Sequence, residues 1–105
     1  MIATAWNNGK HHPSGAGHGL KLHMQDRDRY FIKAWKTVVL ELEGYSETVE
    51  VNVDKPSFWG PTRRELISKH IGIWLIANNL APWSKGKPPK LNLKPEGGNK
   101  LILYY

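Results

Sequence analysis

One segment of this sequence constrains the fold more than any other, because it carries the only long helical pattern of apolar residues. These residues recur at the i, i+4, i+7 and i+8 spacing that lines one face of an α-helix, namely Ile67, Ile71, Trp74 and Leu75. Further apolar residues widen that face: Ile73, Ile76, Ala77 and Leu80. A helix that is apolar around so much of its circumference predicts a sheet packed over it.

The sequence defines the end of this helix more sharply than its start. Pro82 forbids continuation. At the N-terminal side, Thr62 followed by Glu65 matches a capping box, whereas Ser68 would cap a shorter helix. Gly72 lies inside either version at a cost of about 1 kcal/mol relative to Ala. We expect a close approach to a neighbouring strand to be the reason for this glycine.

Short strand patterns surround this helix along the rest of the chain. The clearest are residues 36–43 and 48–53, in which apolar and polar residues alternate around a turn, so they are expected to pair as a hairpin. Further strands are expected at residues 1–6, 20–24, 90–93 and 100–104, and a short helix at 26–31. Six or seven short strands with one main and one short helix predict a small α+β barrel, a single domain over residues 1–105.

Charge is the compositional feature that points towards function. The chain carries 15 Lys and Arg residues against 9 Asp and Glu residues, a formal net charge of +6. The excess lies in the flanks, since residues 1–24 contribute +2, residues 54–83 contribute +2 and residues 84–105 contribute +4, whereas residues 25–53 contribute −2. Basic flanks predict attraction to a polyanion, either a nucleic acid or an acidic protein surface.

The absence of cysteine excludes disulfides and thiolate metal sites and is typical of a reducing cytoplasm. No apolar run approaches the roughly 20 residues that a membrane-spanning helix needs. The N-terminus also lacks the apolar core of a signal peptide. We therefore expect a cytoplasmic protein with no membrane partner.

The histidines are the first candidates for catalytic or metal chemistry. His11, His12 and His18 share one glycine-rich loop, and His23 lies on the next expected strand. No acidic residue lies in that loop, and no His-x-x-x-His pair lies on a helix. A flexible basic and polar loop is therefore a better interpretation than a metal or acid–base site. The glycines of the loop lack the Lys-Ser/Thr of a phosphate-binding P-loop. We expect no enzymatic activity, no metal and no cofactor.

A second candidate site is the turn DKPSFWGPTRR, which joins an expected strand to the helix segment. Two interpretations are open. In the first, Phe58 and Trp59 only fix the turn to the core. In the second, they fix the base of a recognition arm that offers Arg63 and Arg64 to a ligand.

The order of these elements carries a resemblance to a known family. The chain has a strand, a glycine-rich basic loop, GLKLHM, the short helix DRDRYF, the pair KTVVLELE and TVEVNV, the arm SFWGPTRR and then ELISKHIGIWLIANNL. This order resembles the B3-like pseudobarrel DNA-binding domain of plant transcription factors, which also serves as the effector-binding domain of some restriction endonucleases. The best local match runs from Trp59 to Leu80. It implies a short strand over residues 64–67 and Ser68 as the helix N-cap.

The resemblance also implies two DNA-gripping arms, because B3-like domains hold the major groove as a wrench does. The N-arm would be residues 7–18, with these residues facing DNA: Asn8, Lys10, His11, His12 and Ser14. The C-arm would be residues 55–64, with these residues facing DNA: Lys55, Ser57, Trp59, Thr62, Arg63 and Arg64. Lys and Arg side chains supply phosphate contacts, and Asn, Arg or His side chains read base edges.

The sequence therefore predicts a module that binds double-stranded DNA and has no catalysis of its own. One alternative is an RNA or single-stranded nucleic-acid binder, in which Trp6, Trp59 and histidine side chains would stack on bases. Another is a small basic interaction protein, such as a phage or defence-system accessory, with an acidic protein as its partner. A nuclease that uses His11, His12 or His18 fits least well.

Overall fold

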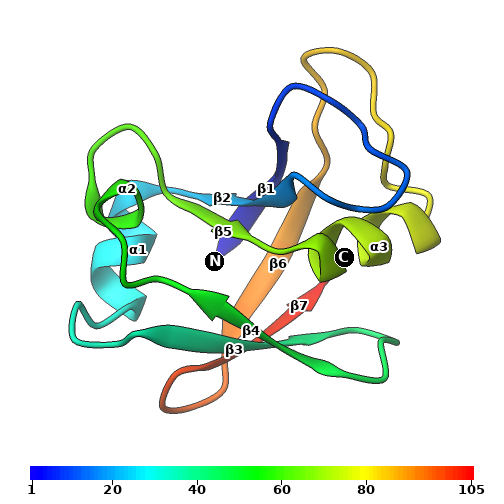
Figure 1. Cartoon of the computed structure of the whole chain (residues 1–105). Helices are drawn as coiled ribbons and strands as arrows, with labels where there is room; N and C mark the ends of the chain where they lie inside the picture. Colours follow the sequence, from blue (N-terminus) through cyan, green and yellow to red (C-terminus); the bar gives the residue numbers. More distant parts are fainter.

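The computed structural model describes residues 1–105 and has a seven-stranded, nearly closed, barrel-like sheet with three helices (Figure 1). The strands are β1 (Ile2–Asn7), β2 (His18–Leu22), β3 (Thr37–Leu42), β4 (Thr48–Asn52), β5 (Glu65–Ile67), β6 (Lys90–Pro95) and β7 (Lys100–Tyr104). The helices are α1 (Met24–Tyr30), α2 (Pro56–Trp59) and α3 (Lys69–Ala77). This arrangement confirms the expected small α+β domain with a barrel-like sheet.

The strand order in the sheet is β4-β3-β7-β6-β1-β2-β5. Every neighbouring pair is antiparallel except β3 and β7, which run parallel. The two edge strands, β4 and β5, approach each other without a shared hydrogen-bond ladder, so the barrel stays open along one seam (Figure 1). The turn between β6 and β7 lies at the opposite end of the barrel from the N-arm (Figure 1).

The expected hairpin of β3 and β4 is present and supplies one wall of the core. Val38 pairs with Val51, and Leu40 pairs with Val49. All four side chains are buried, because alternate residues of a strand point to the same face. Leu101 of β7 lies opposite Leu40 in the parallel ladder and continues the apolar layer.

The start of α3 confirms the shorter of the two expected helices. Glu65–Ile67 form β5, and Ser68 is the N-cap, whose hydroxyl oxygen accepts a hydrogen bond of 3.2 Å from the backbone N–H of His70. At the other end Asn79 adopts a φ of 58°, a left-handed conformation that asparagine tolerates better than most residues. The helix therefore ends at Ala77, before the proline that the sequence points to.

The buried face of α3 is narrower than the sequence predicts. Ile71, Trp74 and Leu75 are buried, and the indole Nε1 of Trp74 donates a hydrogen bond of 2.7 Å to a carbonyl just after β3. Three apolar residues assigned to the buried face are instead exposed: Ile67, Ile73 and Ala77. Ile67 belongs to β5 and points outward because its neighbour Leu66 points into the core. The sheet covers only one side of α3, which leaves Ile73 and Ala77 in solvent.

The helix α2 is an addition to the expected pair of helices. The sequence predicts only a turn here, because one helical turn is too short to show an apolar period. Pro56 occupies the start of α2, where its missing N–H needs no intrahelical partner. Phe58 then enters the core with no exposed surface. None of the three helices has the length and apolar character to cross a bilayer.

Gly72 makes the expected close approach, but its neighbour is the N-terminal loop and not a strand. A Cβ atom at Gly72 would lie 2.6 Å from the Cα of Gly15, closer than real Cβ contacts allow. Gly15 itself has a φ of 87°, which favours glycine. The pair of glycines therefore brings the loop backbone directly onto the helix backbone.

Replacing Gly72 by alanine should lower the free energy of unfolding by about 1–3 kcal/mol, because the added methyl group has no room against Gly15. Helix propensity acts in the opposite direction, since alanine is favoured over glycine by about 1 kcal/mol in a helix interior. Urea unfolding followed by tryptophan fluorescence measures the net change, which should be a loss of stability. A variant more stable than the unmodified chain would show that the loop does not lie on α3.

Candidate nucleic-acid interface

The N-arm (residues 7–18) is a loop held by its own hydrogen bonds. At its base, the backbone N–H of Asn8 donates to the carbonyl of Gly17 at 2.9 Å. Towards its tip, the hydroxyl oxygen of Ser14 lies 2.8 Å from Nδ1 of His12. Gly15 joins the loop to α3, as described above. The barrel therefore defines where the arm projects.

The five N-arm residues expected to face DNA share one property, which is that all are exposed: Asn8, Lys10, His11, His12 and Ser14. His18 differs from the other loop histidines. It is fully buried at the start of β2, with Nδ1 3.0 Å from the carbonyl oxygen of Gly15. The expectation that all three histidines belong to a flexible polar loop is therefore wrong for His18.

A second loop, residues 82–89, lies beside the N-arm (Figure 1). The rings of His11 and Trp83 meet edge to face, with their centroids 4.5 Å apart. A hollow of about 410 Å³ separates the two loops, and its walls include Asn7, Gly9 and Lys85. The sequence did not reveal this neighbourhood, because nothing local in it relates residues 82–89 to the N-arm.

The base of the C-arm (residues 55–64) is fixed to the barrel by aromatic packing and by a buried arginine. The indole Nε1 of Trp59 donates to the carbonyl of Val53 at 3.0 Å. Nη1 of Arg27 donates to the carbonyls of Phe58 and Gly60 at 2.8 and 2.6 Å. The guanidinium also lies 5.4 Å from the Trp59 ring centroid, within cation–π range. The indole therefore fixes the arm to the barrel.

Arg27 is a residue that sequence analysis missed. It lies on α1 with only 5 % of its surface exposed, and it pairs with Asp28 at 2.9 Å. A charged residue in a short polar helix is usually solvated, so no signal in the sequence singles it out. Its burial is possible because two carbonyls and one carboxylate satisfy the guanidinium.

The two arginines at the end of the C-arm have different surroundings. Arg63 is exposed, and so are Ser57 and Thr62. Arg64 is half-buried, because its Nε donates to the carbonyl of Leu22 at 2.8 Å and its Nη1 donates to the carbonyl of Pro61. Arg63 is therefore the more available cation of the pair.

Between the arms, the outer face of the sheet is also basic. Thr4 of β1 pairs with Lys21 of β2 on one side and with Lys90 of β6 on the other, so these three side chains share one face. Thr4 and Lys21 line a hollow of about 250 Å³ with His23 and Arg64. Arg64 was expected at the site, but Lys21 and Lys90 were not, because an outward-facing lysine on a strand looks like any solvated residue.

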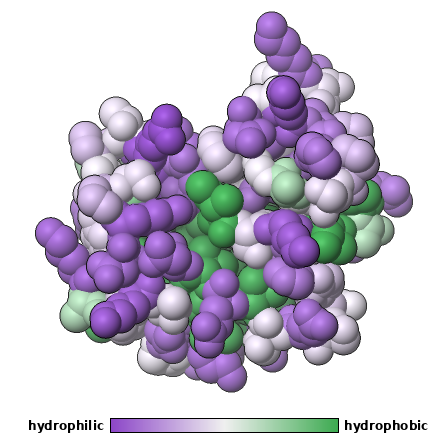
Figure 2. All heavy atoms as spheres, in the orientation of Figure 1, coloured by the Kyte–Doolittle hydropathy of each residue, from purple (hydrophilic) through white to green (hydrophobic).

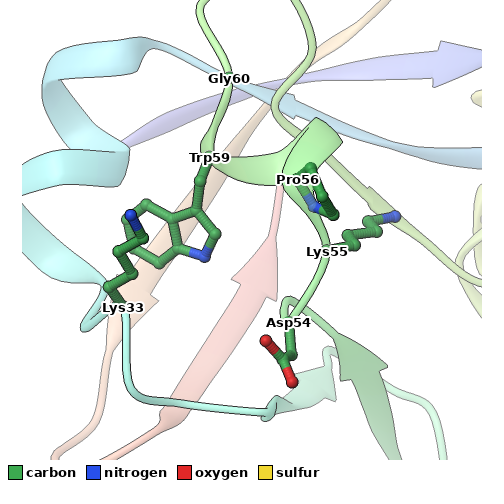
Figure 3. A pocket seen from close by; sticks show the side chains of 6 residues that line it. All are labelled: Lys33, Asp54, Lys55, Pro56, Trp59 and Gly60. Carbon is green, nitrogen blue, oxygen red and sulfur yellow. The ribbon is translucent and has the colours of Figure 1, made fainter.

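On the C-arm, Lys55 lines a separate hollow of about 430 Å³ (Figure 3). Lys33, from the loop after α1, and Trp59, from α2, form part of its wall. Asp54 brings a carboxylate to the same hollow. This mixed charge suits a phosphate less well than the hollow around Lys21 does.

The cations of the two arms have no acidic partners. The two ion pairs in the structure are Arg27–Asp28 and Lys94–Glu96, and neither uses an exposed arm residue. Hydrophilic atoms cover both upper projections of the molecule, and hydrophobic atoms reach the surface in the hollow between and below them (Figure 2). Lys10 and Arg63 are therefore free to meet an external anion.

No group of three or more His, Asp or Glu side chains is close enough together to hold a metal ion. Comparison with known proteins adds no family assignment. A scan against protein-family models and searches of curated proteins and of solved structures find no match for this chain. The function is therefore inferred from the geometry of the chain itself.

Replacing Arg27 by methionine should lower the free energy of unfolding by about 2–4 kcal/mol, because two carbonyls lose charge-assisted hydrogen bonds. Amide hydrogen exchange should also speed up at residues 58–60. Arg27→Lys is the matched control: it keeps the charge but loses the planar fork, so it should recover only part of the loss. Unchanged exchange at residues 58–60 in Arg27→Met would show that Arg27 does not hold the C-arm.

Proposed function

We propose that this chain is a B3-like domain that binds double-stranded DNA in the major groove through its N-arm and C-arm. One observation carries the proposal: two exposed, cation-bearing loops project on either side of β2 (Figure 1), and Lys21 and Arg64 line a hollow of the sheet next to β2. The net charge of +6 supports a polyanionic ligand. The order of strands and helices supports the B3-like assignment, as does the short strand before α3.

The side chains divide into two roles on this proposal. Lys10 and Lys21 contact phosphates, and Lys85 extends the phosphate contacts along the neighbouring loop. Asn8 and Arg63 are the candidates for reading base edges, because amide and guanidinium groups form paired hydrogen bonds with adenine and guanine in the major groove. Arg64 supports the C-arm through its backbone contacts and reaches the ligand only with its remaining N–H groups.

The competing interpretations predict different behaviour. A single-stranded ligand would need free aromatic rings to stack on. Trp59 offers only the part of its ring that lines the hollow beside Lys33, because its indole is hydrogen-bonded to Val53 and lies beside Arg27. Trp6 and Trp83 are half-buried. Duplex DNA is therefore the favoured ligand, and a gel-shift comparison of duplex DNA, single-stranded DNA and RNA tests the choice.

Affinity for duplex DNA should fall steeply with salt. If about six phosphates are neutralised, the slope of log affinity against log salt concentration should be near −5, since each phosphate contributes about −0.9. Fluorescence anisotropy at several salt concentrations measures the slope. Binding that does not respond to salt would indicate an acidic protein partner or an apolar contact instead.

Arg63→Ala should weaken binding to a selected duplex by about 1–3 kcal/mol and reduce the preference over a scrambled duplex. Lys100→Ala is the matched control: it removes the same charge from an exposed residue at the other end of the barrel, where β7 begins (Figure 1). The control should bind both duplexes nearly as well as the unmodified chain does. Equal losses in the two variants would mean that only net charge matters and that the C-arm has no recognition role.

A further inference from the structure

A buried histidine without a partner lies beneath the N-arm. His18 has no exposed surface, and its Nε2 is the only buried side-chain nitrogen or oxygen in the structure that makes no hydrogen bond. Leaving such an atom unsatisfied costs about 1–3 kcal/mol. Buried polar atoms are normally hydrogen-bonded, so Nε2 has the capacity to bind one further group.

The surroundings of His18 define what that ligand must offer. Nδ1 lies 3.0 Å from the carbonyl oxygen of Gly15 and 3.2 Å from that of Ala16. Carbonyl oxygens only accept hydrogen bonds, so Nδ1 carries the proton. In the neutral imidazole, Nε2 is then an acceptor. A ligand at Nε2 must therefore present an N–H or O–H group.

A cavity of about 360 Å³ lies beside this ring. Its walls come from α3 and the chain after it, from the N-arm and from β2, and they include Ile76, Ala81, Pro82, Pro13, His11 and His18. The ring of Trp83 packs edge to face against two of these imidazole rings, with centroid distances of 4.5 Å to His11 and 6.1 Å to His18. No carboxylate lines the cavity, so its walls are flat or apolar surfaces and imidazole rings.

We propose that this cavity binds one flat heteroaromatic ring of the nucleobase type, with an N–H group carried by that ring, such as an exocyclic amino group, donating to Nε2 of His18. The volume falls within the range of about 300–1,000 Å³ that small-molecule sites have. Proline, isoleucine and imidazole surfaces pack against the faces of such a ring. Because Nε2 is buried, a ligand reaches it only after a side-chain movement, and the exposed His11, whose ring centroid lies 5.9 Å from that of His18, is the candidate for that movement.

Two sources supply this chemistry. One is a free nucleobase or nucleoside. The other is a base extruded from a nucleic acid held by the N-arm. Enzymes that act on single bases use such extrusion to reach the base. The second source rests on the proposed DNA-binding function, whereas the first does not.

The first test is a calorimetric titration with 9-methyladenine and 1-methylcytosine, each of which offers an amino N–H. Their dimethylamino analogues are matched controls, because they keep the ring and lose the donor. At least one parent base should bind, and its control should bind at least about tenfold more weakly. On binding, the ¹⁵N resonance of His18 Nε2 should shift.

Two variants test the cavity itself. His18→Phe keeps a flat ring and removes the acceptor, and Ile76→Trp fills the cavity from α3 while leaving His18 in place. Each should weaken binding of the parent base at least about tenfold with the melting transition still cooperative. If Ile76→Trp binds the base as well as the unmodified chain does, the cavity assignment is wrong, whatever the stability of His18→Phe.

A duplex that contains 2-aminopurine separates the two sources. A rise in fluorescence that occurs with the unmodified chain and not with Ile76→Trp assigns the cavity to an extruded base. Nucleoside binding without such a rise assigns it to a free base. Both variants should retain duplex affinity within about threefold, because neither residue contacts the duplex in the proposed function. If the unmodified chain itself does not bind duplex DNA, that result counts against the proposed function alone and leaves the cavity proposal to the titrations. If none of these probes binds in the cavity, the proposal is overturned.

Discussion

The contact between Gly15 and Gly72 is the constraint on which the rest of this structure depends. One face of α3 fills the barrel through Ile71, Trp74 and Leu75, while Gly72 lets the N-terminal loop lie directly on the same helix. Core packing and arm position are therefore coupled, because the helix cannot shift in the barrel without moving the loop. The same contact between loop and helix holds His18 in the interior, since its Nδ1 lies within hydrogen-bond distance of the carbonyl oxygen of Gly15.

The C-arm is attached by different chemistry and from a different helix. Arg27 of α1 binds the carbonyls of Phe58 and Gly60, and the Trp59 indole binds the carbonyl of Val53, just after β4. Since β2 leads from the N-arm into α1, one strand connects the supports of both arms. The distance between the arms is thus a property of the sheet. Supports fixed by the sheet are consistent with the duplex recognition proposed above, because the groove dimensions of a duplex are fixed.

The five histidines show how far tertiary surroundings separate residues of one type. His11 and His12 are exposed on the N-arm, and His23 is exposed at the start of α1. His70 lies on α3, with Nδ1 2.8 Å from the hydroxyl oxygen of Tyr45. His18 alone is buried with a free ring nitrogen. His11 therefore belongs both to the exposed surface of the N-arm and to the wall of the cavity, whereas His18 belongs to the cavity alone.

The sequence by itself determined the local features: the apolar face around Trp74, the cap at Ser68, the hairpin of β3 and β4 and the basic flanks. These follow from periodicity, capping chemistry and charge, which act between residues that are close in the chain. Only the tertiary structure decided that β7 lies parallel to β3, that Trp83 meets His11, that Arg27 is buried and that Gly72 meets Gly15. Each of these depends on how distant segments pack, and a single sequence carries no periodic pattern that pairs them.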